Sequence, residues 1–207
     1  VERSYIVHVP DTYSDTTAPT PILLAFHGAG GVGADFVEQF QVAVDKGDFV
    51  GVYPDGLENS WNVKYEDSKA DDVAFASMLV QSLQGVPGID TSKPVAVGFS
   101  NGAALTHKIA IETDLVVAIA PHVSQLLKEN QPQPAGKKVS VMQLLAADDS
   151  MCPYDGGVGI LGYDFMPGVD SAATWAAHNG CDSDPVETQV GEHVKMEWEN
   201  CEEGRQV

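Results

Sequence analysis

The sequence has few basic residues, and this shortage is its clearest bulk property. Eleven Lys and Arg stand against 30 Asp and Glu, which gives a formal net charge of −19 over 207 residues. A surface with this charge repels the phosphates of nucleic acids and the headgroups of anionic lipids. We therefore expect neither nucleic acid nor a membrane as a partner. Neutral polysaccharides, neutral polyesters and small esters stay open as ligands, although solubility alone explains an acidic surface.

Long apolar runs and paired cysteine motifs are missing as well. No run approaches the roughly 20 apolar residues of a membrane-spanning helix, and none of the three cysteines belongs to a C-x-x-C motif. Cys181 and Cys201 flank a strand-like segment and could close a local loop as a disulfide, which suits an exported protein. The alternative is three reduced thiols, Cys152 included, in a cytosolic protein. No motif indicates a metal or a cofactor.

What the chain does contain is short apolar runs that alternate with amphipathic segments. We expect strands over residues 3–9, 22–26, 49–53, 95–97, 115–120 and 139–145, with Pro121 ending the fifth, and two late strands over 186–190 and 194–198. We expect helices over residues 34–44, 71–83, 103–111 and 169–179, and a glycine-rich loop over 156–167. This alternation predicts an α/β fold with a mostly parallel central sheet and helices on both faces. At 43% hydrophobic residues, the chain is long enough for one such domain over residues 1–207.

The pentapeptide Gly98-Phe99-Ser100-Asn101-Gly102 joins one of these strands to the following helix. Its G-x-S-x-G pattern is typical of a nucleophile elbow, in which a sharp turn exposes the serine hydroxyl at the end of a strand. Glycines suit such a turn because they tolerate strained backbone and close packing. An ordinary strand-to-helix turn with an incidental serine is the alternative.

A glycine-rich stretch, His27 to Gly31, follows an earlier buried strand. In serine hydrolases of the α/β type, such a loop supplies one N–H of the oxyanion hole, and the residue after the nucleophile supplies the other. Here these residues are Ala29 and Asn101. A phosphate-binding loop is disfavoured because the P-loop lysine is absent. His27 and Trp61 are candidates for contact with substrate, although His27 could hold the loop in shape and Trp61 could fill the core.

A serine nucleophile needs a general base, and the base needs an acid that orients it. Along the chain of an α/β-type hydrolase the order is Ser, acid, His. Asp149 follows the strand expected over 139–145 and is the candidate acid, with Asp148 as the alternative. Only His178 and His193 come later. Neither lies in a loop after a strand, so His193 is a weak fallback for the base.

Taken together, these motifs resemble the secreted esterase family of polyhydroxybutyrate-depolymerase-like and feruloyl esterase enzymes. The motifs that carry the resemblance are Arg3-Ser4-Tyr5, His27 to Gly31, Val52 to Gly56, Trp61, Asp72 to Phe75, Gly98 to Gly102, Asp149 to Tyr154, and Trp175 to Cys181 with Cys201. The resemblance implies an α/β-hydrolase fold and a serine esterase that works without a cofactor. It further implies Ser100 as nucleophile, Asp149 as acid and a Cys181–Cys201 disulfide.

The family places its histidine in a glycine-rich stretch after one more strand beyond the second of these cysteines. This sequence stops at Val207, where that strand would begin. We therefore expect a C-terminally incomplete domain that lacks the last strand and the catalytic histidine. The expected protein is a secreted, monomeric carboxylesterase for feruloyl or acetyl esters of plant cell-wall polysaccharides. A polyester depolymerase is the alternative within the same chemistry, and a non-catalytic binding domain is the alternative of another class.

Overall fold

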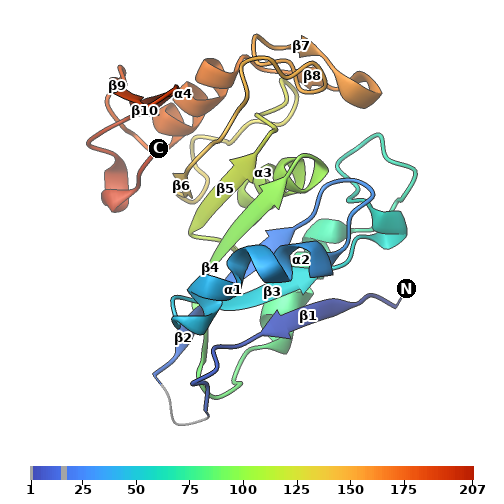
Figure 1. Ribbon diagram of the computed structural model, residues 1–207. Helices are drawn as coiled ribbons and strands as arrows, with labels where there is room; N and C mark the ends of the chain where they lie inside the picture. The colour runs from blue at the N-terminus through green and yellow to red at the C-terminus, as the bar shows by residue number, and fades with distance from the viewer. Residues whose placement is uncertain (1, 15–17) are drawn as a thin grey trace.

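A six-stranded sheet forms the centre of the molecule (Figure 1), which is a computed structural model that describes residues 2–14 and 18–207. Its strands are β1 (Tyr5–His8), β2 (Thr20–Phe26), β3 (Val50–Pro54), β4 (Ile89–Phe99), β5 (Ala118–His122) and β6 (Ser140–Val141). They lie in the order β1-β3-β2-β4-β5-β6, and every pair is parallel except β1 with β3. The predicted mostly parallel sheet is thereby confirmed. Residues 15–17 of the segment before β2 lie outside the described residues.

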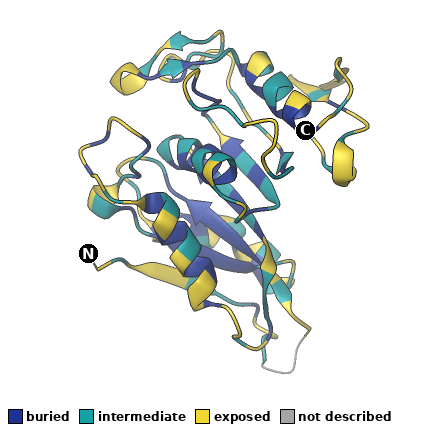
Figure 2. Cartoon of the chain, turned by 180° about the vertical axis from the view of Figure 1, so that it is seen from behind, coloured by how far each residue is buried: buried dark blue, intermediate teal, exposed yellow. Residues whose placement is uncertain are grey.

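Helices cover both faces of this sheet, as the alternation in the sequence predicts (Figures 1 and 2). The helices are α1 (Val37–Asp45), α2 (Asp72–Ser82), α3 (Asn101–Glu112) and α4 (Gly168–His178), with single 3-10 turns at Gly33–Phe36, Leu57–Asn59, Ile160–Gly162 and Glu202–Gly204. Alternate strand residues face opposite sides. Leu24 and Phe26 belong to the main core with α2 and α3, whereas Ala25 packs with Phe36 next to α1.

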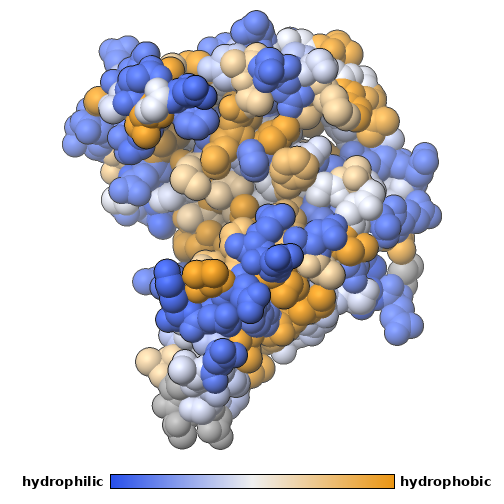
Figure 3. Space-filling model, in the orientation of Figure 1, coloured by the Kyte–Doolittle hydropathy of each residue, from blue (hydrophilic) through white to orange (hydrophobic). Residues whose placement is uncertain are grey.

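The face of the sheet on the α1 side is only partly covered. Phe99, at the end of β4, is 42% exposed, and Met142, just after β6, is 61% exposed. Between the end of β4 and α1 lies a hollow of about 470 Å³ that Phe40, Phe99 and His122 help to line. Apolar side chains accordingly reach the surface in the middle of this view (Figure 3).

The sheet differs from the prediction at β5 and β6. Pro121 does not end β5, because a proline lacks only the N–H, and its carbonyl still accepts a hydrogen bond from the N–H of Leu144 at 3.1 Å. The strand expected over residues 139–145 is regular only at Ser140–Val141. On the other side of β6, the N–H of Val141 donates to the carbonyl of Gln206 at 2.8 Å.

The rest of the chain after β6 forms short elements. The expected glycine-rich loop contains a small hairpin of β7 (Gly157–Val158) and β8 (Asp164–Phe165), and the predicted late hairpin is present as β9 (Val186–Val190) and β10 (His193–Glu197). The Cys181–Cys201 disulfide that the resemblance implies is present, while Cys152 is a buried free thiol. None of the helices in residues 2–14 and 18–207 has the length and apolar character needed to cross a bilayer.

Candidate active site

Ser100 occupies the turn between β4 and α3 in a strained conformation. Its φ of 52° and ψ of −116° are rarely adopted by residues other than glycine, and such strain is typical of functional turns. The N–H of Ser100 donates to the carbonyl of His122 at 2.8 Å, which anchors the turn to the neighbouring strand β5. The side chain is partly exposed at the C-terminal edge of the sheet. This geometry is that of a nucleophile elbow.

The two glycines of the pentapeptide allow α3 to begin directly against the sheet. A Cβ atom on Gly102 would lie 2.1 Å from the carbonyl oxygen of Phe26, and one on Gly98 would lie 2.2 Å from the carbonyl oxygen of Gly102. Both positions are backbone contacts that cannot yield by a side-chain rotation. The glycines are therefore required by the close approach of helix and sheet.

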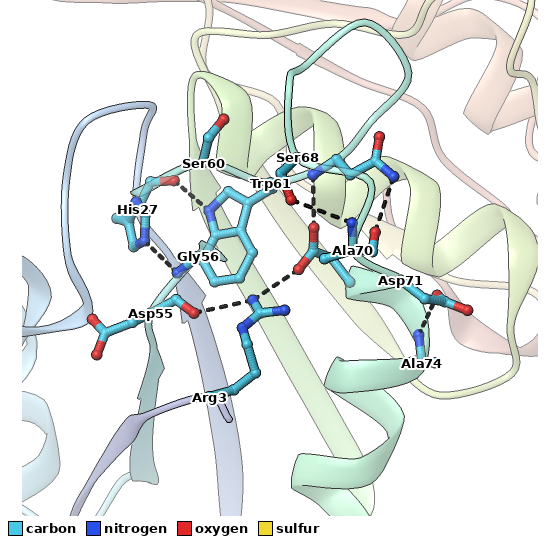
Figure 4. Close-up of polar contacts among 12 residues, drawn as sticks. Arg3, His27, Asp55, Gly56, Ser60, Trp61, Ser68, Ala70, Asp71 and Ala74 are labelled. Atoms are coloured by element: carbon cyan, nitrogen blue, oxygen red, sulfur yellow. Dashed lines mark hydrogen bonds and ion pairs between the residues drawn. The ribbon is translucent and has the colours of Figure 1, made fainter. Parts of the chain in front are cut away.

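The loop that begins at His27 is held by the His27 ring (Figure 4). Nε2 accepts a hydrogen bond from the N–H of Gly56 at 2.9 Å, and Nδ1 lies 2.7 Å from the carbonyl oxygen of Gly28, to which it donates. This arrangement requires a neutral ring with its proton on Nδ1. Burial lowers the pKa of His27 and so favours the same neutral form. His27 thus holds the loop in shape.

Trp61 lies in the core, and the expectation that it contacts substrate is wrong. Its side chain is 0% exposed, and its indole N–H donates to the carbonyl of His27 at 2.8 Å (Figure 4). The ring also packs edge-on against Phe26, with the ring centroids 5.3 Å apart. The indole therefore supports the loop that begins at His27. Both ring nitrogens of His27 are likewise hydrogen-bonded within the protein, so neither is free for the expected contact with substrate.

Two backbone N–H groups near Ser100 are left free. Within the described residues, neither the N–H of Ala29 nor the N–H of Asn101 has a hydrogen-bond partner. Asn101 is the first residue of α3, where the helix dipole favours negative charge. The Ala29 loop lies beside the end of β4, because a Cβ on Gly28 would be 3.0 Å from the Phe99 ring. These donors are suited to an anionic oxygen at Ser100.

Asp149 lies beyond β6, at the same edge of the sheet as Ser100. Because β4, β5 and β6 are neighbouring parallel strands, the residues after their C-terminal ends share one edge. The Oδ1 atom of Asp149 accepts hydrogen bonds from the N–H groups of Met151 at 2.7 Å and Cys152 at 2.8 Å. One carboxylate oxygen thus fixes the turn, which leaves Oδ2 for another partner. Asp148 is exposed beside it.

The described contacts assign the base to none of the six histidines. His8, His27, His107, His122, His178 and His193 all fall in the described part of the chain, and none of their rings is hydrogen-bonded to Ser100 or Asp149. His122 is next to Ser100 by strand register, and its exposed ring packs edge-on against Phe99. His193, the weak fallback, is exposed on the β9–β10 hairpin, and His178 is buried against Trp175.

A buried carboxylate, Glu66, lies behind the elbow and was not predicted from the sequence. Its Oε1 accepts a hydrogen bond from the side-chain amide of Asn101 at 3.0 Å. Glu66 stands in the polar stretch of residues 64–69, which is typical of an exposed loop. The only signal that could have pointed to it is its position in the loop that begins at Trp61.

The comparisons with known proteins agree on a class of enzyme. No family model matches the chain. It is 22% identical over 214 residues to feruloyl esterase C of Emericella nidulans, an alignment that covers 96% of this chain and 71% of the relative. Among solved structures, acetyl xylan esterase from Aspergillus awamori matches with a TM-score of 0.68 and 16% identity, covering 90% of this chain and 78% of that one.

A third match is the poly(3-hydroxybutyrate) depolymerase LpqC from Bordetella parapertussis. Its TM-score is 0.60 at 12% identity, with 86% of this chain and 73% of that chain covered. The chain therefore has the α/β-hydrolase fold, as predicted, and is similar to carboxylic ester hydrolases. It spans between 47% and 72% of the length of the curated relatives it matches.

Proposed function

We propose that this protein is a serine carboxylesterase in which Ser100 is the nucleophile. The observation that carries the proposal is the strained Ser100 turn beside two backbone N–H groups that lack a partner in the described residues. Strain at a non-glycine residue is retained where the surrounding structure holds it for function. The relatives named as esterases support the same reaction class.

In the proposed mechanism, Ser100 Oγ attacks the carbonyl carbon of the ester while a general base takes its proton. The carbonyl oxygen becomes an oxyanion, which the N–H groups of Ala29 and Asn101 bind. Collapse of this intermediate expels the alcohol, protonated by the conjugate acid of the base, and leaves an acyl group on Ser100. Water, deprotonated by the same base, then attacks the acyl group and releases the free acid and the serine.

Asp149 is proposed as the acid that orients the base. Its position at the shared edge of the sheet and its free Oδ2 atom support this role. The base is proposed to be a histidine, because an imidazole both accepts and returns the proton near neutral pH. Removing Asp149 should cost roughly 10⁴-fold in kcat, the effect of losing the orienting acid of a serine triad.

The proposed substrates are feruloyl or acetyl esters of plant cell-wall polysaccharides. Support comes from the relative named feruloyl esterase and the structural neighbour named acetyl xylan esterase. The neutral character of such polymers also suits a surface with a net charge of −19. The Cys181–Cys201 disulfide supports a secreted protein, since disulfides persist outside the reducing cytosol.

Labelling with a fluorophosphonate probe tests the nucleophile directly. The purified full-length protein should be labelled at Ser100, as mapped by peptide mass spectrometry, and Ser100→Ala should abolish both labelling and ester hydrolysis. Ser77→Ala is the matched control, because the Ser77 hydroxyl only donates to the Val73 carbonyl within α2. A protein that is folded and unlabelled would instead favour the non-catalytic binding domain.

A polyester depolymerase is the second candidate function. It is favoured by the similarity to LpqC and by apolar side chains around the β7–β8 hairpin, where Val158 is 71% and Leu161 is 61% exposed. Exposed apolar side chains near a site are suited to an apolar polymer surface. A panel of methyl ferulate, acetylated xylan and short polyhydroxyalkanoate esters separates the two, by the ratio of kcat/KM values.

A further inference from the structure

Glu66 is a buried carboxylate that is satisfied entirely by hydrogen bonds. The residue is 7% exposed, and among the described residues it forms no ion pair. Its Oε2 atom accepts from the N–H groups of Val63 at 2.9 Å and Lys64 at 3.0 Å, and from the hydroxyl of Tyr163 at 2.8 Å. Its Oε1 atom accepts from the side-chain amide of Asn101 at 3.0 Å. Burying a charge is costly, so four donors at one carboxylate mark a site built to hold it.

The side chain of Asn101 is fixed on every side by this site. Its Oδ1 atom accepts from the N–H of Trp61 at 2.8 Å and from the hydroxyl of Ser60 at 3.3 Å. Its Nδ2 atom donates to the carbonyl of Trp61 at 3.0 Å and to Glu66. All the donors and acceptors of the amide are therefore used. Asn101 directly follows Ser100, so holding this side chain also holds the start of α3.

The other oxygen of the Glu66 carboxylate binds Tyr163, which shares an apolar cluster with Cys152 in the segment that carries Asp149. The Tyr163 hydroxyl, which donates to Glu66, also accepts from the N–H of Tyr65 at 2.9 Å. Tyr163 is buried with Cys152 in one apolar cluster, and the N–H of Cys152 donates to Asp149. Burial, followed by the hydrogen bond to Glu66, raises the pKa of Tyr163, so the hydroxyl keeps the proton that it donates. Glu66 thus lies between the elbow and the acid.

We propose that Glu66 is a positioning residue for ester hydrolysis. It orients Asn101, so that the Asn101 N–H faces the developing oxyanion, and through Tyr163 it holds the Asp149 segment in register with the elbow. This inference rests on the proposed serine esterase function. An oxyanion donor must be placed before the reaction, because its benefit comes from needing no reorganisation in the transition state. Loss of Glu66 should therefore lower kcat more than it raises KM.

The substitution Glu66→Gln tests the hydrogen bond between Glu66 Oε1 and the Asn101 side chain. The glutamine oxygen can keep the three donors on the Oε2 side, which leaves the glutamine amide facing the Asn101 amide, donor against donor. In the full-length protein, with p-nitrophenyl acetate as substrate, we expect kcat to fall roughly 10-fold to 100-fold with KM changed by less than about 2-fold. An unchanged kcat in the folded variant would overturn the proposal.

A double-mutant cycle separates positioning from simple destabilisation. If Glu66 acts through Asn101, adding Glu66→Gln to Asn101→Ala should lower kcat by less than about 2-fold further, whereas additive losses contradict the proposal. Asp71→Ala is the matched stability control. It removes the cap on the N–H of Ala74 and should lower Tm without changing kcat.

The outcomes also distinguish this proposal from the function on which it rests. A wild-type protein that neither hydrolyses esters nor reacts with a fluorophosphonate contradicts the serine esterase. An active wild type with a fully active, folded Glu66→Gln contradicts only the role of Glu66. Should Glu66→Gln not fold by circular dichroism, Glu66→Asp keeps the charge but shortens the reach to Asn101, and the same fall in kcat is expected.

Discussion

The chain up to His122 and the chain after it are stabilised in different ways. In the first part, β2 is hydrogen-bonded to strands on both sides, and α1, α2 and α3 pack against the sheet. In the second part, β6 to β8 have two residues each, and the β9–β10 hairpin pairs only with itself. Ser100 and the N–H groups of Ala29 and Asn101 therefore lie at the edge of long paired strands, whereas Asp149 follows the two-residue strand β6 in a region with short backbone pairing and one disulfide.

Side-chain contacts join the two parts across their boundary. The indole N–H of Trp175 on α4 donates to Nδ1 of His107 on α3 at 3.2 Å. The Tyr163 hydroxyl donates to Glu66 at 2.8 Å and accepts from the N–H of Tyr65 at 2.9 Å. Because each contact depends on one pair of groups, single substitutions should separate the two parts more readily than they disturb the sheet. The relative position of Ser100 and Asp149 therefore depends on the short β5–β6 pairing and on a few buried polar contacts.

The largest expected loss of stability follows from adding a side chain at Gly102 in the elbow. Gly102→Ala would place a Cβ 2.1 Å from the Phe26 carbonyl oxygen, which cannot move without opening the sheet, so unfolding free energy should fall by more than about 3 kcal/mol. The control is Gly47→Ala, where φ is positive, unlike at Gly102, but nothing lies within 4 Å of the new Cβ. It should cost about 1 kcal/mol. Urea unfolding measures both, and equal losses would contradict a rigid first part.

Removal of the disulfide should weaken the second part alone. Cys181→Ser combined with Cys201→Ser opens a loop with a sequence separation of 20, which should lower stability by about 3 kcal/mol. We expect the amides of β9 and β10 to exchange hydrogen faster, while those of β2 and β4 keep their protection. Cys152→Ala serves as the control because Cys152 is a free thiol. Faster exchange throughout the sheet would show that the two parts unfold together.

Acidic pH should lower the stability of the protein through His107, which lies where the two parts of the chain meet. Burial lowers the pKa of this imidazole from 6.5 to about 4. Its Nδ1 accepts from Trp175, so a proton there would oppose another donor. Between these two pH values the unfolded chain binds a proton that the folded chain does not. Stability is thus complete above pH 6.5 and falls towards pH 4, by about 1.4 kcal/mol per pH unit and about 3 kcal/mol in total.

Urea unfolding from pH 7 to pH 4 measures this dependence. His107→Gln should flatten the fall, because a neutral amide does not titrate, whereas His193→Gln should leave it unchanged since His193 is exposed on β10. His27 adds a loss of the same sign, because burial lowers its pKa as well. A wild-type protein with equal stability at pH 7 and pH 4 would contradict neutral, buried imidazoles.

The smallest expected losses of stability come from removing one serine hydroxyl in each part, at Ser171 and at Ser77. Ser171 accepts from the N–H of Leu126 at 2.9 Å and donates to the Gln143 side chain at 2.7 Å, so it joins three segments of the second part. Ser171→Ala leaves a buried N–H unpaired and should cost about 1–2 kcal/mol. Ser77 donates only to its own helix, and Ser77→Ala should change stability by less than about 0.5 kcal/mol. Thermal unfolding of both variants measures the difference.

The first part of the chain could largely be predicted from the sequence, because its signals are local. The run before Gly98 predicts a strand and the stretch after Ser100 predicts a helix, and both are found where expected. The second part was harder, because β6 has only two regular residues and its Val141 forms a backbone hydrogen bond with the distant Gln206. Sequence spacing contains no information on such long-range partners.

The residues of the candidate site divide in the same way. Ser100 and Asp149 were predicted from their places after expected strands, and the structure places both at the C-terminal edge of the sheet. Trp61 was predicted to contact substrate, but a loop tryptophan is buried or exposed according to what packs above it, here the His27 loop. Glu66 was missed because a charged residue in a polar stretch normally lies in solvent.

Local sequence by itself determined the alternation of strands and helices, the elbow with its two glycines, and the acidic surface. Periodicity and backbone strain are properties of neighbouring residues, so the sequence expresses them directly. Tertiary structure alone decided that Trp61 supports the loop that begins at His27, that Glu66 joins Asn101 to Tyr163, and that His107 is buried and neutral. Burial and hydrogen bonding depend on groups that are distant in the chain, and only folding brings these groups together.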